Sequence, residues 1–295
     1  MPRAALLSIH ARVEGTRTST WEDPSLVQVW GPRYNVYVVA ARDLPLFTLA
    51  RLPDGGRTRR KAEDLAERLQ TLLDGASMRY DEAGQALGVH GNALRYAALT
   101  GTLAIRWEGA RLPVVWTIPP PEIDRAHATL ELARRFVHVF GPATPQGFAK
   151  WAGLGVRQAA GAFDELAGEL LPVRTPLNDA WILGQDEATI REPPTPTARA
   201  RLLPSGDAYT LGITIEDRAL LVPDAGRRAE LWTPRVWPGA LLVDGKIVGT
   251  WRRAQARMTV RPWQRLSAAA RKAIVAEAES LPLPTSTGRM SVDWE

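Results

Sequence analysis

The sequence contains no cysteine, which excludes disulfide bonds, thiolate zinc sites and a thiol nucleophile. Its four histidines (His10, His90, His127 and His138) are scattered and form no metal-ligand pattern. We therefore expect no metal and no cofactor. No apolar run approaches the roughly 18 residues that a membrane helix needs, and no signal peptide is recognisable. The sequence predicts a cytoplasmic protein that does not associate with a membrane.

Lysine is nearly absent too, because 33 of the 37 basic residues are arginine and only four are lysine. The guanidinium group binds phosphates and base edges through paired hydrogen bonds, which suits a nucleic-acid partner. A GC-rich genome explains the same ratio through its codons. It does not explain the net charge of +5, and this charge favours a polyanionic partner.

Residues 67–118 carry the most informative pattern. Apolar residues at helical spacing run to residue 74, and two further helices are expected over residues 79–87 and 89–100. Two β-like runs, 102–107 and 114–118, follow. Three helices and a hairpin are typical of a winged helix-turn-helix, whose usual partner is duplex DNA.

The whole chain predicts an α+β protein of tandem winged-helix modules followed by a C-terminal β-rich, barrel-like domain. Proline-rich segments mark two of its boundaries, at residues 119–121 and 193–196. The expected parts are a partial first winged helix (1–62), a second winged helix (63–121), a third winged helix (122–192) and the C-terminal domain with a final helix (193–295).

Several elements are expected outside the central module. Helices are predicted at residues 3–13, 25–30, 125–140, 156–171 and 267–280. Short strands are predicted in the C-terminal part at residues 201–203, 209–213, 219–222, 240–243, 247–251 and 256–260. The residues from 282 onward are expected to be loosely held.

Two segments resemble a known bacterial family, residues 202–212 (LLPSGDAYTLG) and 243–253 (VDGKIVGTWRR). These are the winged-helix DNA-binding proteins related to the AlkZ-type DNA glycosylases. Residues 10–15 (HARVEG) and 26–33 (LVQVWGPR) are similar to the same family, so the resemblance covers nearly the whole chain. It implies tandem winged helices and a C-terminal β domain around duplex DNA, in enzymes that remove alkylated or crosslinked bases.

The resemblance also implies a catalytic motif of glutamine, an apolar residue, then glutamine or aspartate, just before the helix matched by residues 3–13. Residues 1–295 do not include that position, so no catalytic residue is predicted. Two hypotheses stay open. In the first, the true start lies upstream, as the abrupt beginning suggests, and the protein is a DNA glycosylase. In the second, it is a non-catalytic DNA-binding protein, either a regulator or a damage binder.

Double-stranded DNA is the expected partner, bound by a monomer, because no heptad or dimer helix is visible. Arginine and asparagine are usual readers of base edges and phosphates. The residues expected to contact DNA are Arg12, Arg33, His90, Asn92, Arg95, Arg106, Arg111, Arg157 and Arg252. Each has a structural alternative: a winged helix can serve only for packing, an exposed hairpin arginine is common, and Arg12 could pair with Glu14 or Asp43.

Asp207 lies in a loop within the matched segment. A glycosylase needs a group that orients water or stabilises an oxocarbenium-like sugar, and a carboxylate can do this. An aspartate in a loop more often caps a turn through its side chain. We therefore favour the capping role.

Overall fold

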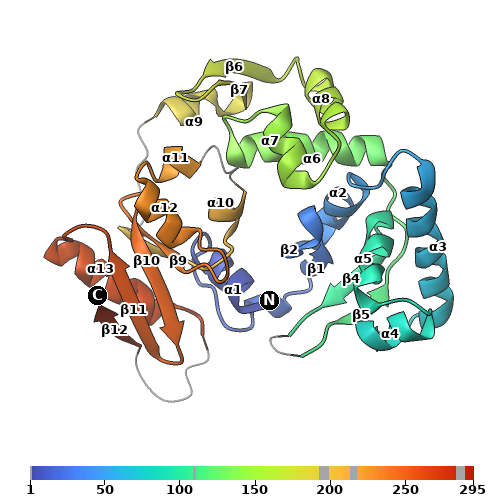
Figure 1. The fold of residues 1–295 in the computed structure, drawn as a ribbon, viewed down its shortest axis with the longest axis horizontal. Helices are drawn as coiled ribbons and strands as arrows, with labels where there is room; N and C mark the ends of the chain where they lie inside the picture. The colour runs from blue at the N-terminus through green and yellow to red at the C-terminus, as the bar shows by residue number, and fades with distance from the viewer. Residues whose placement is uncertain (1, 109–110, 193–198, 213–217, 284–289) are drawn as a thin grey trace. The chain divides into compact units, whose positions relative to one another are not determined.

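The computed structural model describes residues 2–108, 111–192, 199–212, 218–283 and 290–295 (Figure 1). The chain forms two compact units: residues 1–2 with 22–190, and residues 3–21 with 191–295. Both units combine helices with β-sheet, so the predicted α+β class is confirmed. Across the described ranges, no helix is long and apolar enough to cross a membrane.

The first unit contains a five-stranded antiparallel sheet in the order β2-β1-β4-β5-β3. Its strands are β1 (Leu26–Trp30), β2 (Val36–Ala40), β3 (Ser77–Arg79), β4 (Leu103–Arg106) and β5 (Val114–Thr117). The predicted helix at residues 25–30 is therefore wrong. Its valines and tryptophan suit a pleated strand, and all five residues pair with β2.

Helices pack on this sheet: α2 (Leu44–Leu49), α3 (Gly56–Leu73), α4 (Tyr80–Ala86) and α5 (Leu94–Ala97). The apolar stripe of α3 (Leu65, Leu69 and Leu73) is buried against residues of α5 and the strands. The chain leaves α3 at Asp74, whose φ of 42° places it in the left-handed region. The predicted helix boundary at residue 74 is confirmed.

The second half of this unit contains α6 (Arg125–Phe140), α7 (Pro145–Ala152), α8 (Val156–Glu165), β6 (Leu170–Arg174), β7 (Asp179–Leu183) and α9 (Glu187–Arg191). The helix predicted at residues 125–140 is confirmed, with Asp124 as its N-cap. The helix predicted at 156–171 ends earlier, at Glu165, because Leu170 already belongs to the β6–β7 hairpin.

The second unit contains α1 (Pro2–His10), β8 (Ala200–Leu203), α10 (Ala208–Leu211), α11 (Arg218–Leu221), α12 (Ala225–Leu231), β9 (Gly239–Val243), β10 (Lys246–Ala254), β11 (Arg257–Pro262), α13 (Ala268–Ser280) and β12 (Ser291–Trp294). Its sheet has the order β12-β11-β10-β9-β8, with only β11 and β12 parallel.

Short 3₁₀ helices from both units complete the described chain: Thr20–Glu22, Pro32–Tyr34, Ala41–Asp43, Gly91–Ala93, Ala98–Thr100 and Gly184–Asp186.

The predicted barrel is wrong, because β8 and β12 are opposite edges of an open sheet and form no closed barrel in the described residues. Helix α13 covers this sheet with Ile274 and Ala278 in a shared core, which removes the need for closure. The strands predicted at 209–213 and 219–222 are also wrong, since α10 and α11 occupy most of them and residue 213 lies outside the described residues. Residues 291–294 form a paired strand instead of a loose end.

The four-part division remains a prediction. One sheet joins β1 and β2 of the expected first part with β3, β4 and β5 of the second. The linker predicted at residues 193–196 lies outside the described residues.

A buried tryptophan fixes the centre of the second sheet. Trp251 is 5% exposed, and its indole Nε1 donates a hydrogen bond to the carbonyl oxygen of Leu203 at 2.9 Å. The ring lies over Gly239, where an added Cβ would come within 2.2 Å of Nε1. Only glycine at position 239 leaves room for this hydrogen bond.

We expect Gly239→Ala to lower the free energy of unfolding by roughly 3 kcal/mol, because the tryptophan ring or the strand must move. Chemical denaturation would measure this. Gly161→Ala is the matched control, since Gly161 lies inside α8 with open space around its Cβ position. The control should be neutral or stabilise by about 0.5 kcal/mol. Equal stability of the two variants would contradict the assigned role of Gly239.

Candidate nucleic-acid interface

The segment expected to read DNA is not one continuous helix. Residues 91–93 and 98–100 form 3₁₀ turns on either side of the single turn of α5. His90 is the N-cap, and its Nδ1 accepts a hydrogen bond from the amide of Asn92 at 3.1 Å. Asn92 is exposed, so its side chain remains available to solvent or a ligand.

Arg95 does not point freely outward as predicted. Its guanidinium carbon lies 4.9 Å from the ring centre of Tyr34 and 5.5 Å from that of Tyr96. The side chain is half-buried, and its Nε is buried without a hydrogen-bond partner in the described residues. The neighbouring Leu94 and Ala97 are buried in the core.

The hairpin β4–β5 carries the two arginines predicted for a wing. Arg106 donates through Nε to Glu108 at 2.6 Å and lies 3.9 Å from a carboxylate oxygen of Glu22. Arg111 is exposed, and the structure records no ion pair to its side chain among the described residues. Residues 109–110 of the expected hairpin tip lie outside those residues. Of the two, Arg111 is therefore better placed for a phosphate.

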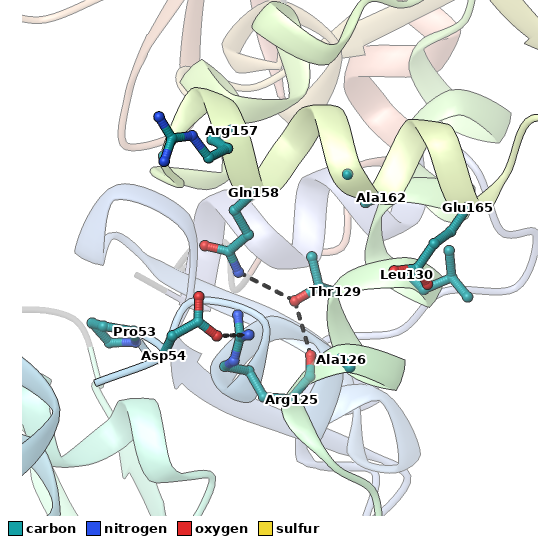
Figure 2. Close-up of a pocket in the computed structure, with 12 residues that line it drawn as sticks. Pro53, Asp54, Arg125, Ala126, Thr129, Leu130, Arg157, Gln158, Ala162 and Glu165 are labelled. Carbon is teal, nitrogen blue, oxygen red and sulfur yellow. Dashed lines mark hydrogen bonds and ion pairs between the residues drawn. The ribbon is translucent and has the colours of Figure 1, made fainter.

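Arg33 and Arg157 are both exposed. The backbone of Arg33 packs against Gly153 at the end of α7, where a Cβ would lie 3.7 Å from the Arg33 nitrogen. Arg157 stands in the first turn of α8, beside Gln158 (Figure 2).

Arg157 lines a cavity of about 530 Å³ between α6, α8 and residues 53–54. Gln158 is fixed in it, since its Nε2 donates to the carbonyl of Ala50 at 3.0 Å and lies 3.3 Å from Oγ1 of Thr129. Asp54 pairs with Arg125, as the dashed line in Figure 2 shows. With Glu165 also in the lining, carboxylates balance the arginines, so this cavity offers no excess positive charge to a phosphate.

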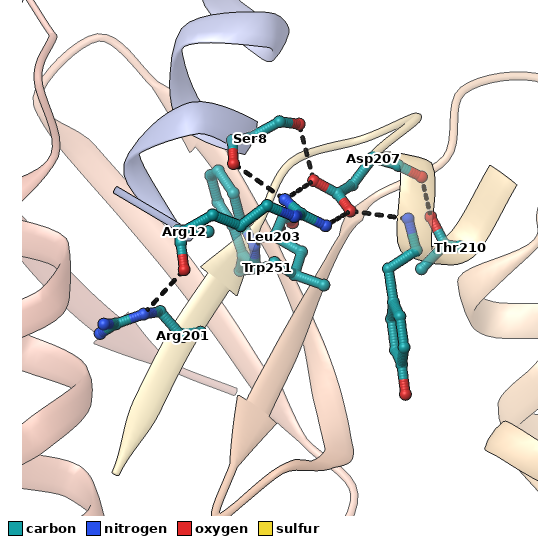
Figure 3. A network of polar contacts seen from close by, with 9 residues as sticks. Ser8, Arg12, Arg201, Leu203, Asp207, Thr210 and Trp251 are labelled. Atoms are coloured by element: carbon teal, nitrogen blue, oxygen red, sulfur yellow. Dashed lines mark hydrogen bonds and ion pairs between the residues drawn. The ribbon is translucent and has the colours of Figure 1, made fainter. Parts of the chain in front are cut away.

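In the second unit, Asp207 binds Arg12, the partner that sequence reasoning did not find. The Arg12 nitrogens lie 2.7 and 2.9 Å from the two carboxylate oxygens (Figure 3). Asp207 is 1% exposed, and it also accepts hydrogen bonds from Oγ of Ser8 at 2.6 Å and the amide of Tyr209 at 2.9 Å. As the N-cap of α10 it has the capping role that we favoured. Both oxygens are occupied, which leaves Asp207 poorly suited to orient a catalytic water.

Arg201 and Glu277 form a second polar contact beside α1. Arg201 Nε donates to the carbonyl of Ala11 at 3.1 Å, and its NH1 lies 3.2 Å from Glu277. Burial lowers the pKa of His10, which contacts Ser280 at 3.2 Å. These contacts hold α1 against β8 and α13 of the same unit.

Arg252 is exposed, but its guanidinium donates to the carbonyl of Val236 at 2.9 Å. The predicted DNA contacts thus fall on both units: Arg12 and Arg252 on the second, the other seven on the first. No group of three or more metal-ligating side chains occurs in the described part of the chain. All nine DNA contacts stay predictions.

The sequence profile of the family described as "DNA glycosylase AlkZ-like" matches residues 1–282. The chain belongs to the AlkZ-like DNA glycosylase family. The resemblance found in the sequence is therefore confirmed.

One AlkZ-like relative, from Streptomyces sahachiroi, is named an interstrand DNA cross-link repair glycosylase. It is 24% identical over 269 residues, which cover 80% of this chain and 70% of the relative. The solved structure of the Streptomyces sahachiroi DNA glycosylase AlkZ has a TM-score of 0.80 and 19% identity, over 99% of this chain and 89% of that chain. This likeness shows that the fold is shared.

Sequence reasoning missed Arg51, the most buried cation among the residues of this AlkZ-like chain whose burial the structure describes. Only 8% of Arg51 is exposed, and burial lowers its pKa to about 10. Its NH1 donates to the carbonyl of Trp30 at 3.0 Å, whereas its Nε has no partner in the described residues. No local pattern marks Arg51, because the groups around it come from distant segments.

We expect Asp207→Asn to lower the free energy of unfolding of this AlkZ-like protein by roughly 2–3 kcal/mol, because the amide cannot replace the charged bonds to Arg12 and Ser8. Thermal or urea denaturation would measure the loss. Asp244→Asn is the control, since its exposed carboxylate lies 3.7 Å from Arg199 and should contribute under about 1 kcal/mol. A stable Asp207→Asn variant would show that the ion pair is not structural.

Proposed function

We propose that this protein binds duplex DNA and takes part in the excision of alkylated or crosslinked bases. The observation that carries this proposal is the family match over residues 1–282. The name of the Streptomyces sahachiroi relative, an interstrand cross-link repair glycosylase, suggests the class of lesion. The net charge of +5 and the exposed arginines support a polyanionic partner.

The proposed DNA contact is a winged helix made of α3, α4, α5 and the β4–β5 hairpin, within a tandem arrangement of such modules. In this interpretation Asn92 faces a groove and Arg111 contacts a phosphate near the wing. The protein would act as a cytoplasmic monomer, since tandem modules cover a long footprint without a second copy.

Hydrolysis of the N-glycosidic bond adds water to the sugar C1′ and releases the base, so it needs a group that activates or orients water. We assign no such group within residues 1–295. Asp207, the most buried aspartate among the described residues, is occupied by Arg12 and Ser8. The alternative function is therefore a non-catalytic DNA-binding protein of the same family, which keeps duplex affinity but releases no base.

The deciding experiment measures base release from duplex DNA that contains an N7-alkylated guanine. Residues 1–295 would be compared with a form extended upstream in frame. Release by either form supports the glycosylase. Duplex binding with no release by either form favours the non-catalytic alternative, and absence of binding rejects both.

The placement of the winged helix has its own test. We expect Arg111→Ala to weaken duplex affinity a few-fold and to reduce the slope of log affinity against log salt by about 0.9, the value for one phosphate contact. Fluorescence anisotropy over a salt series would measure both. Arg42→Ala is the control, because Arg42 is an 86% exposed arginine on another segment of the same unit. An unchanged slope in Arg111→Ala would refute the wing contact.

A further inference from the structure

Three cations surround two tyrosine rings in the first unit. Arg51 lies 4.6 Å from the ring centre of Tyr34, and Arg95 lies 4.9 Å from it. Lys61, on α3, lies 5.0 Å from the ring centre of Tyr96. The two rings meet edge to face, with centroids 5.4 Å apart. We call these five residues the tyrosine–cation cluster.

The positive charge of this cluster is not balanced. The structure records no ion pair between a carboxylate and Arg51, Arg95 or Lys61 in the described residues. Burial raises the pKa of Tyr34, so the tyrosine does not supply a negative charge at neutral pH. Burial also lowers the pKa of Arg51, with no carboxylate opposing it. Like charges gathered around the same two rings repel one another when no anion lies between them.

Two of these cations each also have a buried nitrogen atom that donates no hydrogen bond to any described residue. The Nε atoms of Arg51 and Arg95 have no acceptor among the described residues. A buried donor without a partner costs free energy, and a charged one costs more. An anion at the surface of the cluster would offset this cost through its attraction for the positive charges.

The backbone that presents Tyr34 is held in an uncommon conformation. Arg33 and Tyr34 have φ angles of 54° and 58°, in the left-handed region that non-glycine residues rarely adopt. Such strain persists where surrounding structure enforces it, and it often marks a binding site. The ring that this backbone carries lies against both Arg51 and Arg95.

We propose that the tyrosine–cation cluster binds a single backbone phosphate of duplex DNA. Arg95 and Tyr96 are half-buried and Lys61 is exposed, so the cluster extends from the surface toward the buried Arg51. A phosphodiester at the surface of the cluster accepts hydrogen bonds from Arg95 and Lys61. The buried Arg51 attracts it by charge alone, because its NH1 already donates to Trp30. Arg95, which the sequence predicts to contact DNA, then contacts the DNA backbone. This inference rests on the proposed DNA-binding function.

The test compares salt dependence of binding to an undamaged duplex of about 20 base pairs. We expect Lys61→Met and Arg95→Gln each to reduce the slope of log affinity against log salt by about 0.9, with a loss of roughly threefold to tenfold at low salt. Arg95→Lys keeps the charge and should retain most of the slope. Lys272→Met, a change at an exposed lysine on α13, is the matched control and should leave it unchanged. Thermal denaturation of each variant checks that it is folded.

Inorganic phosphate distinguishes a DNA phosphate from a free one. If the wild type binds DNA and both charge-removing variants keep its slope, the cluster proposal is wrong while the proposed function stands. A second outcome is that inorganic phosphate raises the melting temperature of the wild type but not of Lys61→Met, while both proteins have the same slope of log DNA affinity against log salt. The ligand is then free phosphate, and the assignment of a DNA backbone phosphate is overturned. If the wild type binds no duplex, the proposed function and the backbone assignment both fail.

Discussion

The ion pair between Arg12 and Asp207 joins residues that are 195 positions apart and makes the second unit a single body. Asp207 would be costly to bury without this cation, because an unpaired carboxylate loses its hydration. Ser8 and the amide of Tyr209 satisfy the remaining lone pairs, so α1 and α10 are fixed by one carboxylate. The placement of the first helix in the unit of the last hundred residues depends on this contact.

The parts of the fold that the sequence predicts well are those that local chemistry determines. Helix α6 follows the aspartate cap Asp124, and α13 follows the serine cap Ser267, so both starts are readable. The predictions for residues 25–30, 209–213 and 219–222 are wrong because short apolar runs fit either a helix or a strand. Pairing with β2 makes residues 26–30 a strand, and the Asp207 cap begins a helix at residues 208–211.

The candidate interface is predictable only in part, because local sequence indicates exposure but not which distant residues meet. Exposed cations such as Arg111 and Arg157 follow from residue type and position, and they remain available in the structure. The surroundings of Arg95 could not be predicted, because Tyr34 comes from a 3₁₀ turn more than fifty residues earlier. Family membership, by contrast, can be recognised from short segments spread along the chain, because this comparison does not depend on which segments contact one another in the fold.

The second unit is built from two separate stretches of chain, residues 3–21 and 191–295, with residues 22–190 of the first unit between them. During synthesis, helix α1 therefore leaves the ribosome long before Asp207 exists. At a synthesis rate of roughly 5–20 residues per second, the interval between the synthesis of α1 and that of Asp207 is on the order of 10–40 seconds. Leu6 and Leu7, which end 4% and 5% exposed, have no finished core to enter during that time. Residues 22–190 can fold as they emerge, whereas the second unit can be completed only after its second stretch, from residue 191 onward, has been made.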